Sequence, residues 1–326
     1  EYLMKRFKKL LTVLNGGPGD EHVTQRAISL AKANKAQLMF CATHEMPPPV
    51  QGMLIRSGPY KELDRLLRKE RKSNLNEAVA KARAVGQPAR SRLLEGKAFV
   101  SIIYEVLRDD RDLVLFPDDT VTSFRSRLFG SKATHLLRKC PCPVWVLKPA
   151  SKRSRPQRFK RVLAAVNAAT SKPVEAALNT KILELATSLA EREGAEIHVI
   201  HCWSVFGESL LAGPRGPLSK DEIAAYRKQT RHTNHKAVNE LLARFQKEGH
   251  EIHKHILKGE PDTLIPEMSE KLAVDVVVMG TVARTGLDGV LIGNTAENVL
   301  QQIGRSVLAV KPEGFVSPVR LENPGS

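Results

Sequence analysis

The sequence predicts an α/β protein built from two copies of one domain in tandem, each copy with a five-stranded parallel sheet that helices cover on both faces. Two observations carry this prediction. Segments of the chain match one another at a fixed spacing, which is typical of a repeated unit. Short aliphatic runs alternate with amphipathic segments, which is typical of parallel strands buried on both faces. The 326 residues, of which 42% are hydrophobic, suffice for two domains of ordinary size.

The repeat is clearest in the later part of each copy. Four segments match at an offset of 163 residues without a gap, namely 94–97 with 257–260, 112–116 with 275–279, 128–131 with 291–294, and 144–149 with 307–312. Residues 10–15 match 162–167 at an offset of 152, so the second copy holds 11 extra residues before Gly259. These matches predict a first domain over 1–150, a basic linker over 151–161 and a second domain over 162–326.

The elements of the first copy follow from the alternation of aliphatic and amphipathic segments. Residues 10–14 predict the first strand, because they are almost all leucine and valine, and a helix is expected over 26–34. The expected order then continues with a strand over 37–42, a long helix over 61–85, a strand over 90–94, a helix over 100–107, a strand over 112–116, a helix over 131–138 and a strand over 144–147.

The second copy repeats this order. Its strands are expected over 162–166, 196–201, 251–257, 275–279 and 307–310. Ser219 and Glu222 stand three residues apart as a capping box, which predicts that the long helix of this copy begins there. The loops after the second strand of each copy, 45–55 and 203–212, are rich in apolar residues. They predict either a cavity for a hydrophobic or amphipathic small molecule, or packing over the long helix of the same copy.

The formal charge of +16 is concentrated in the first half. Residues 1–150 carry 27 Lys and Arg against 15 Asp and Glu, the linker adds six basic residues, and 162–326 hold 18 against 20. Such a surface attracts nucleic acid, but no aromatic residues interleave with the charges to stack on bases. Solvated helix faces are therefore the preferred interpretation, and nucleic acid is an unfavoured partner.

Four cysteines, Cys41, Cys140, Cys142 and Cys202, are too few for a disulfide framework and predict a reducing compartment, hence a cytoplasmic location. Cys140 and Cys142 lack the spacing of a CxxC pair, so core packing is expected rather than redox or metal chemistry. No apolar run approaches the ~20 residues of a membrane span.

The strand ends carry a more specific pattern. In each half a strand ends in Asn, and a later aliphatic strand leads into a turn, a Gly followed by Ser or Asn, a helix, a strand and Lys-Pro. This pattern resembles the universal stress protein family over nearly the whole chain, and the segments 138–145 and 293–297 look like its tandem, two-domain members. The resemblance implies a strand order of 3-2-1-4-5 in each half and a non-enzymatic role in bacterial stress response, as a sensor or scaffold that binds a small ligand.

In nucleotide-binding members of that family an Asp ends the first strand, and Gly-x2-Gly-x9-Gly-(Ser/Thr) follows the fourth. The first half departs from this pattern. Asn15 stands at the Asp position, Pro117 and Thr120 stand at the first two Gly positions, and only Gly130 and Ser131 are kept. Because Pro donates no N–H, we expect no ATP binding in this half.

The second half is closer to the pattern. Asn167 replaces the Asp, Ala283 the second Gly and Asn294 the Ser or Thr, while Gly280 and Gly293 are kept and Thr295 follows. ATP or another adenine nucleotide is therefore expected in this half only, if anywhere. An ATP-hydrolysing enzyme that uses this loop is the alternative, but no general base stands at an obvious spacing, so no catalytic residue is expected. Packed or solvated imidazoles are expected instead of a metal site at His198, His201, His250, His253 and His255.

The last strands of the two halves, 144–147 and 307–310, are edge strands in the strand order that the resemblance implies. Exposed edges of this kind are usually covered or paired. Single-domain relatives pair these edges across a two-fold axis. We therefore predict an internal pseudo-dimer with the two strands antiparallel and Trp145 at or near the seam, and a further homodimer stays open.

Overall fold

The computed structural model describes residues 7–45, 58–118, 131–148, 158–212, 216–247, 249–281 and 293–320. The first half contains β1 (Lys9–Leu14), α1 (Asp20–Asn34), β2 (Gln37–His44), α3 (Gly58–Ala84), β3 (Ala89–Glu95), α4 (Ala98–Asp109), β4 (Leu113–Pro117), α5 (Ser131–Lys139) and β5 (Val144–Leu147). The second half contains β6 (Arg161–Ala165), α6 (Pro173–Glu193), β7 (Glu196–Trp203), α7 (Glu208–Leu211), α8 (Lys220–Lys247), β8 (Ile252–Lys258), α9 (Pro261–Lys271), β9 (Val276–Gly280), α10 (Asn294–Gln302) and β10 (Ser306–Val310).

The strands form one continuous ten-stranded sheet in the order β3-β2-β1-β4-β5-β10-β9-β6-β7-β8. Neighbours within each half are parallel, whereas β5 and β10 are antiparallel, with Val146 opposite Val307 and Trp145 opposite Leu308. Each half therefore has the predicted order 3-2-1-4-5, and the halves meet at their last strands as expected. Trp145 is fully buried at this seam.

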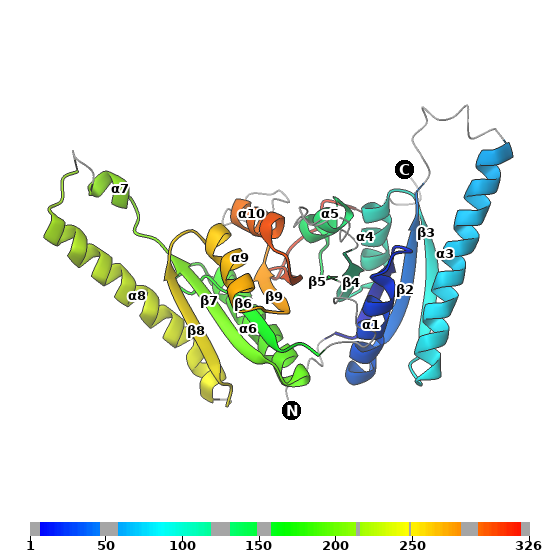
Figure 1. Ribbon diagram of the computed structural model, residues 1–326, viewed down its shortest axis with the longest axis horizontal. Helices are drawn as coiled ribbons and strands as arrows, with labels where there is room; N and C mark the ends of the chain where they lie inside the picture. Colours follow the sequence, from blue (N-terminus) through cyan, green and yellow to red (C-terminus); the bar gives the residue numbers. More distant parts are fainter. Residues whose placement is uncertain are drawn as a thin grey trace.

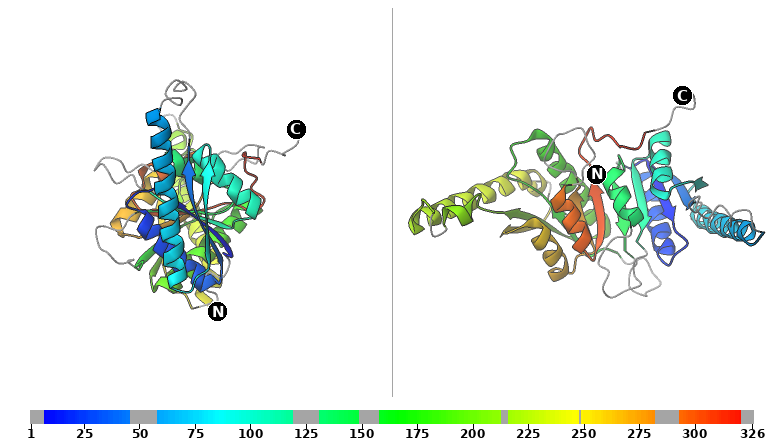
Figure 2. Two further views of the ribbon diagram at one scale, coloured as in Figure 1. Left: turned by 90° about the vertical axis from the view of Figure 1, so that its right-hand side faces the viewer. Right: turned by 90° about the horizontal axis from the view of Figure 1, so that it is seen from above.

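Helices cover both faces of the sheet (Figures 1 and 2). Side chains of α1, α3, α6 and α8 pack in one core, and those of α4, α5, α9 and α10 pack in the other. Each core contains residues of both halves, so the hydrophobic interior runs across the seam. The two longest helices, α3 and α8, lie at opposite ends of the molecule (Figure 1).

Several boundaries differ from those expected. Helix α1 begins at Asp20, six residues earlier, where Asp20 and Glu21 place negative charge in the first turn. A short helix, α7, lies in the segment 203–212 that was expected as a loop. The capping box is confirmed, because the Ser219 amide donates to Glu222 Oε2 at 2.7 Å and the Glu222 amide donates to Ser219 Oγ at 3.2 Å.

Some predicted features lie outside the described residues. These are Thr120, Gly130, Ala283, most of the apolar loop 45–55, and residues 151–157 of the linker. Within the described ranges, every helix is too short or too polar to traverse a lipid bilayer.

Candidate functional site

The direction of the chain reverses at two places in the sheet, between β1 and β4 and between β6 and β9. Loops leave such neighbouring strands toward opposite faces, which opens a crevice at their carboxyl ends. Asn15 and Pro117 lie at the first reversal, and Asn167 and Gly280 lie at the second. The fold thus brings the predicted residues of each half to one edge of the sheet.

Asn167 is held by side chains of α6. Its amide N–H donates to Asn179 Oδ1 at 3.0 Å, and Asn179 Nδ2 donates back to the Asn167 carbonyl at 2.7 Å. The Asn167 carboxamide donates to Glu175 Oε2 at 3.1 Å, and the Thr170 hydroxyl donates to the same oxygen at 2.8 Å. These contacts fix the conformation of the loop after β6, so Asn167 has a structural role in this loop.

His201 supports the same loop from β7. The amide of Ala168 donates to His201 Nδ1 at 3.3 Å, and His201 Nε2 lies 2.7 Å from Asn234 Oδ1 on α8. The imidazole is 1% exposed. It therefore acts as a buried connection between a loop, a strand and a helix.

Of the two kept glycines of the second half, Gly280 is explained by packing. A Cβ on Gly280 would lie 2.7 Å from Leu178 Cδ2 of α6, so this position admits no larger side chain without a shift. Gly293 has an ordinary extended backbone, with φ −64° and ψ 140°, and its amide donates to the Thr281 carbonyl at 3.2 Å. Neither glycine adopts a conformation that requires glycine.

Helix α10 begins at the predicted position. Asn294 and Thr295 form its first turn and are exposed, and Gly293 provides no side-chain cap. The acidic Glu297 also lies in this turn and pairs with Arg138 of α5 in the first half. This helix start is open to solvent and is bordered by a residue of each half.

Lys311, the residue after β10, is a buried cation that the sequence did not single out. Its Nζ donates to Thr281 Oγ1 at 2.6 Å and to the Leu137 carbonyl of α5 at 2.6 Å. Burial lowers the pKa of this amine to about 8. Its repeat equivalent is Lys148, whose Nζ lies 3.2 Å from the buried Asp118 carboxylate. The sequence shows both lysines as part of the Lys-Pro pattern. It does not show that Lys148 pairs with a carboxylate of its own half, whereas Lys311 reaches a carbonyl of the other half.

The first-half site is closed by its own carboxylate. Asp20 accepts hydrogen bonds from the amides of Asn15 at 2.9 Å and Gly16 at 2.8 Å, and the Asn15 carboxamide donates to the Pro117 carbonyl at 3.3 Å. A hollow of about 200 Å³ beside this loop is lined by Asp20, Glu21, Glu77 and neutral or basic neighbours. Ser131 begins α5 and is exposed. Asp20 therefore occupies two backbone amides of this loop, and three carboxylates line the hollow beside it.

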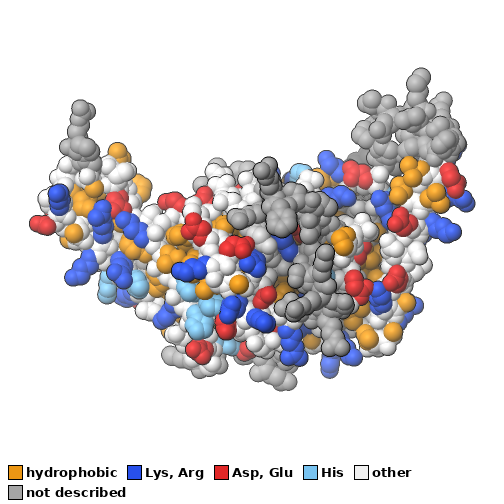
Figure 3. Space-filling model, viewed as in Figure 1, with side chains coloured by type: hydrophobic (Ala, Val, Ile, Leu, Met, Phe, Trp, Pro, Cys, Tyr) orange, Lys and Arg blue, Asp and Glu red, His pale blue; other side chains and the backbone are white. Residues whose placement is uncertain are grey.

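A larger hollow of about 670 Å³ opens at the ends of β7 and β8 in the second half. Residues 204–209 and Ala212 line one side, and Arg227, Lys258, Gly259 and Glu260 complete it. Phe206 is 89% exposed, whereas the neighbouring Val205 is buried. Hydrophobic side chains gather over α7 in the space-filling view (Figure 3, upper left). The apolar segment 203–212 thus lines an open hollow, and only some of its side chains are buried.

Charged side chains face one another across this hollow. Glu208 Oε1 lies 2.5 Å from Arg227 Nε and 2.8 Å from Lys258 Nζ, so α7, α8 and β8 meet in one ion-pair group. The Trp203 indole, just before the hollow, is buried, and its N–H has no hydrogen-bond partner in the described part of the chain.

Comparison with known proteins places the fold in a family. The sequence model of the universal stress protein family matches residues 6–148 and again 158–311. The chain belongs to the universal stress protein family. Universal stress protein E of Escherichia coli (strain K12) is 28% identical over 330 residues, which cover 98% of this chain and 99% of that protein.

Solved structures of universal stress proteins agree in fold. One from Pseudomonas aeruginosa UCBPP-PA14 is 25% identical, covers 95% of both chains and has a TM-score of 0.69. Another from Archaeoglobus fulgidus DSM 4304 is 18% identical, covers 96% of this chain and 98% of that chain, and has a TM-score of 0.62. This chain is thus a tandem universal stress protein with two family domains.

Three histidines of this family member, His198, His253 and His255, lie apart from the two reversals, whereas His201 supports the loop after β6. His198 on β7 stacks on His253 and His255 of β8, with ring centroids 4.8 and 5.3 Å away. In the described ranges no three His, Cys, Asp or Glu side chains are arranged to hold a metal ion. Two of these rings are instead hydrogen-bonded to each other, with His198 Nδ1 and His255 Nε2 3.1 Å apart.

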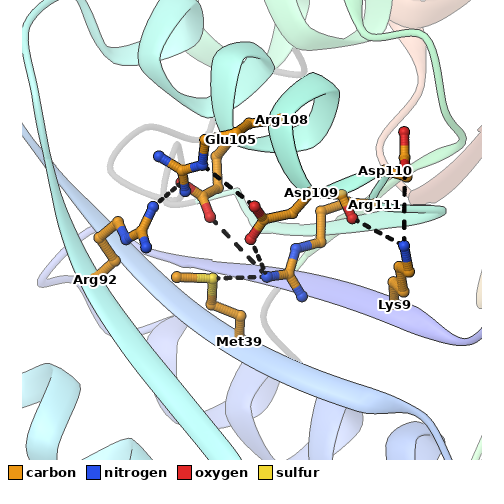
Figure 4. A network of polar contacts seen from close by, with 8 residues as sticks. All are labelled: Lys9, Met39, Arg92, Glu105, Arg108, Asp109, Asp110 and Arg111. Carbon is orange, nitrogen blue, oxygen red and sulfur yellow. Dashed lines mark hydrogen bonds and ion pairs between the residues drawn. The ribbon is translucent and has the colours of Figure 1, made fainter.

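A separate polar network lies near the amino end of β4 (Figure 4). Glu105 of α4 is 1% exposed and pairs with Arg108 and with Arg92 at 3.2 Å. Arg111 approaches the same carboxylate at 4.0 Å and Asp109 at 2.7 Å. Ligands of open α/β sheets bind at the other end of the strands, so this network serves to hold α4 on the sheet.

Proposed function

We propose that the second half binds a small hydrophobic or amphipathic molecule in the hollow beside α7, and that the chain acts without catalysis as a sensor or scaffold in bacterial stress response. One observation carries the proposal: a phenylalanine that is 89% exposed borders an open hollow of about 670 Å³. Burial of a large aromatic side chain that is exposed to water is favourable, and a bound ligand would bury Phe206 most directly.

The charges around the hollow favour an acidic ligand end. Arg227 and Lys258 both contact Glu208, so two cations share one carboxylate. A ligand with a carboxylate or phosphate could bind the same two cations while its apolar part covers Phe206.

The test uses 1-anilinonaphthalene-8-sulfonate, an amphipathic anion whose fluorescence rises in apolar sites. We expect saturable binding to the full chain and an affinity on the order of tenfold weaker in Phe206→Asp, because the variant removes an apolar contact of about 1.5–3 kcal/mol. Val316→Asp is the matched control, since Val316 is 76% exposed outside the hollow. Equal binding to all three proteins would refute the proposed site, and native mass spectrometry of the purified chain would then search for other co-purified ligands.

An adenine nucleotide in the second half is the competing ligand. The exposed first turn of α10 favours it, because the amides of a helix start attract phosphate. Calorimetric titration with ATP and Mg²⁺ tests this second ligand. We expect no more than one weak ATP site per chain. Two equivalent tight sites would contradict the closed first-half loop, and ATP turnover would contradict a non-enzymatic role.

A further inference from the structure

Two cysteines touch at the seam between the halves. Cys140 directly follows α5 and Cys142 lies two residues before β5, with their sulfur atoms 3.6 Å apart. Cys140 is fully buried and Cys142 is 8% exposed. The two sulfur atoms are therefore in van der Waals contact. A disulfide requires a sulfur separation of about 2 Å, so the two sulfur atoms must move closer to form one.

A buried amine from the other half accompanies this pair. The Lys311 ammonium is held by carbonyls of Leu137 and Arg138, at 2.6 and 3.3 Å, just before Cys140 in the chain. Burial lowers the pKa of Lys311 to about 8, and the two cysteines raise it again. An amine cation is thereby fixed near two buried thiols.

The two thiols differ in acidity. Burial raises the pKa of Cys140, but the hydrogen bond from Cys142 and the nearby Lys311 charge outweigh it, so the net pKa lies below its ordinary value. The pKa of Cys142 lies well above its ordinary value, because its hydrogen bond with Cys140 and its burial both disfavour the thiolate. Thiolates and not thiols are nucleophiles. Lys311 Nζ contacts the carbonyls of Leu137 and Arg138, just before Cys140, so Cys140 is the thiol that this cation is placed to activate.

We propose that Cys140 and Cys142 are a redox-active pair, in which Lys311 positions Cys140 for attack on hydrogen peroxide and Cys142 closes the disulfide. The Cys140 thiolate attacks one peroxide oxygen, an S–O bond forms and the O–O bond breaks. The leaving hydroxide takes a proton from the Lys311 ammonium and departs as water. Cys140 is now a sulfenic acid, and its sulfur has lost two electrons.

The second step forms the disulfide. The Cys142 sulfur attacks the Cys140 sulfur, the S–O bond breaks, and the leaving hydroxide takes the Cys142 proton to give a second water. One peroxide, the Cys140 thiolate, the Cys142 thiol and the Lys311 ammonium thus yield one disulfide, two waters and a neutral Lys311, which later regains a proton from solvent. A dithiol reductant reverses the change by thiol–disulfide exchange. This site is independent of the proposed ligand hollow.

The test treats the reduced full chain with one equivalent of hydrogen peroxide and follows its intact mass. We expect a loss of about 2 Da, reversed by dithiothreitol and mapped by proteolysis to the peptide that holds both cysteines. Because the pair is buried, cumene hydroperoxide should react much more slowly than hydrogen peroxide. A chain that loses no hydrogens, or that forms its disulfide through Cys41 or Cys202, would overturn the proposal.

Variants separate the roles of the three residues. In Cys142→Ser the oxidation should stop at Cys140 as a sulfenic acid that dimedone traps, whereas Cys202→Ser should behave as the native chain. Lys311→Met should slow oxidation on the order of tenfold at neutral pH and shift its pH profile upward, because a pKa one unit higher leaves a tenth of the thiolate. An unchanged pH profile in folded Lys311→Met would remove the lysine from the mechanism. If Lys311→Met fails to fold, the pH dependence of the oxidation rate of the native chain tests the role of Lys311 instead. An oxidation rate that rises only above the ordinary thiol pKa would overturn the role of Lys311 in positioning Cys140.

Discussion

Glu105 illustrates how single residues hold this fold together. Its buried carboxylate is shared by Arg92 of β3 and Arg108 of α4, and Arg111 stands beside it at the start of β4 (Figure 4). Burial raises the pKa of Glu105, and the guanidinium charges oppose that rise. One charge therefore connects a helix to two strands, and its loss leaves several cations without their common partner.

We predict that Glu105→Ala lowers the free energy of unfolding by roughly 3 kcal/mol, the cost of breaking a buried ion pair. Chemical denaturation monitored by circular dichroism measures the change. Glu62→Ala is the control, because Glu62 and its partner Arg65 are 52% and 75% exposed, and it should leave the denaturation midpoint unchanged. Equal midpoints for the two variants would show that the network adds nothing to stability.

Residue roles could be predicted only in part. The positions of Asn15 and Asn167 at the reversals followed from the strand pattern, and the structure places both there. Their hydrogen bonds to Pro117 and Glu175 depend on loop geometry that spacing does not reveal. Lys311 reaches across the seam, a contact between residues 174 positions apart, and local sequence carries no signal for it.

At the scale of elements, the paired strands β7 and β8 lie at one edge of the sheet and carry a group of stacked imidazoles. Burial, followed by the neighbouring His253 charge, lowers the pKa of His198, whereas Glu196 opposes this and Arg161 adds to it. Burial, then His198, His253 and Lys271, lowers the pKa of His255. Both rings therefore resist protonation while β7 and β8 are paired.

We predict that acid weakens this strand pair. An unfolded histidine binds its proton at a pH near 6.5, whereas these folded histidines require a lower pH, so the unfolded state binds more protons in between. Stability is therefore present above about pH 6.5 and falls as the pH drops below it. The loss of melting temperature from pH 7.5 to 5.5 should be smaller in His198→Asn and His255→Asn than in the native chain. His232→Asn, an exposed change on α8, should behave as the native chain, and a loss of equal size in all four would remove the imidazoles as its cause.

Elements were predicted better than their ends. Every strand expected from an aliphatic run is present, because buried parallel strands need such runs on both faces. Helix α1 starts earlier and α7 was missed, because a Gly-rich turn and an apolar segment gave no helical periodicity. The capping box marked the start of α8 correctly, since its two hydrogen bonds are local.

At the scale of the whole molecule, the seam joins the halves on both faces of the sheet. On one face Arg26 of α1 pairs with Glu193 of α6 at 2.6 Å, both about 95% buried, and the guanidinium lies over Phe159 at 4.1 Å. On the other face Arg138 of α5 pairs with Glu297 of α10. Cross-seam ion pairs therefore accompany the strand pairing of β5 and β10, so we expect the tandem chain to unfold as one cooperative unit.

This arrangement makes a prediction about unfolding. Val146 is fully buried and faces Val307 across the antiparallel pair, so a carboxylate in Val146→Asp would lie in a hydrophobic core without a partner. The native chain should melt in a single transition. Val146→Asp should either split this transition into two or lower its midpoint by about 4 °C or more, the shift that a loss of roughly 3 kcal/mol produces in a chain of this size. Val174→Asp provides the control, because Val174 is 60% exposed in the first turn of α6, where a negative charge is favourable. Scanning calorimetry decides between the cases: two independent transitions in the native chain, unmoved by Val146→Asp, would show that the halves fold separately and that the seam does not couple them.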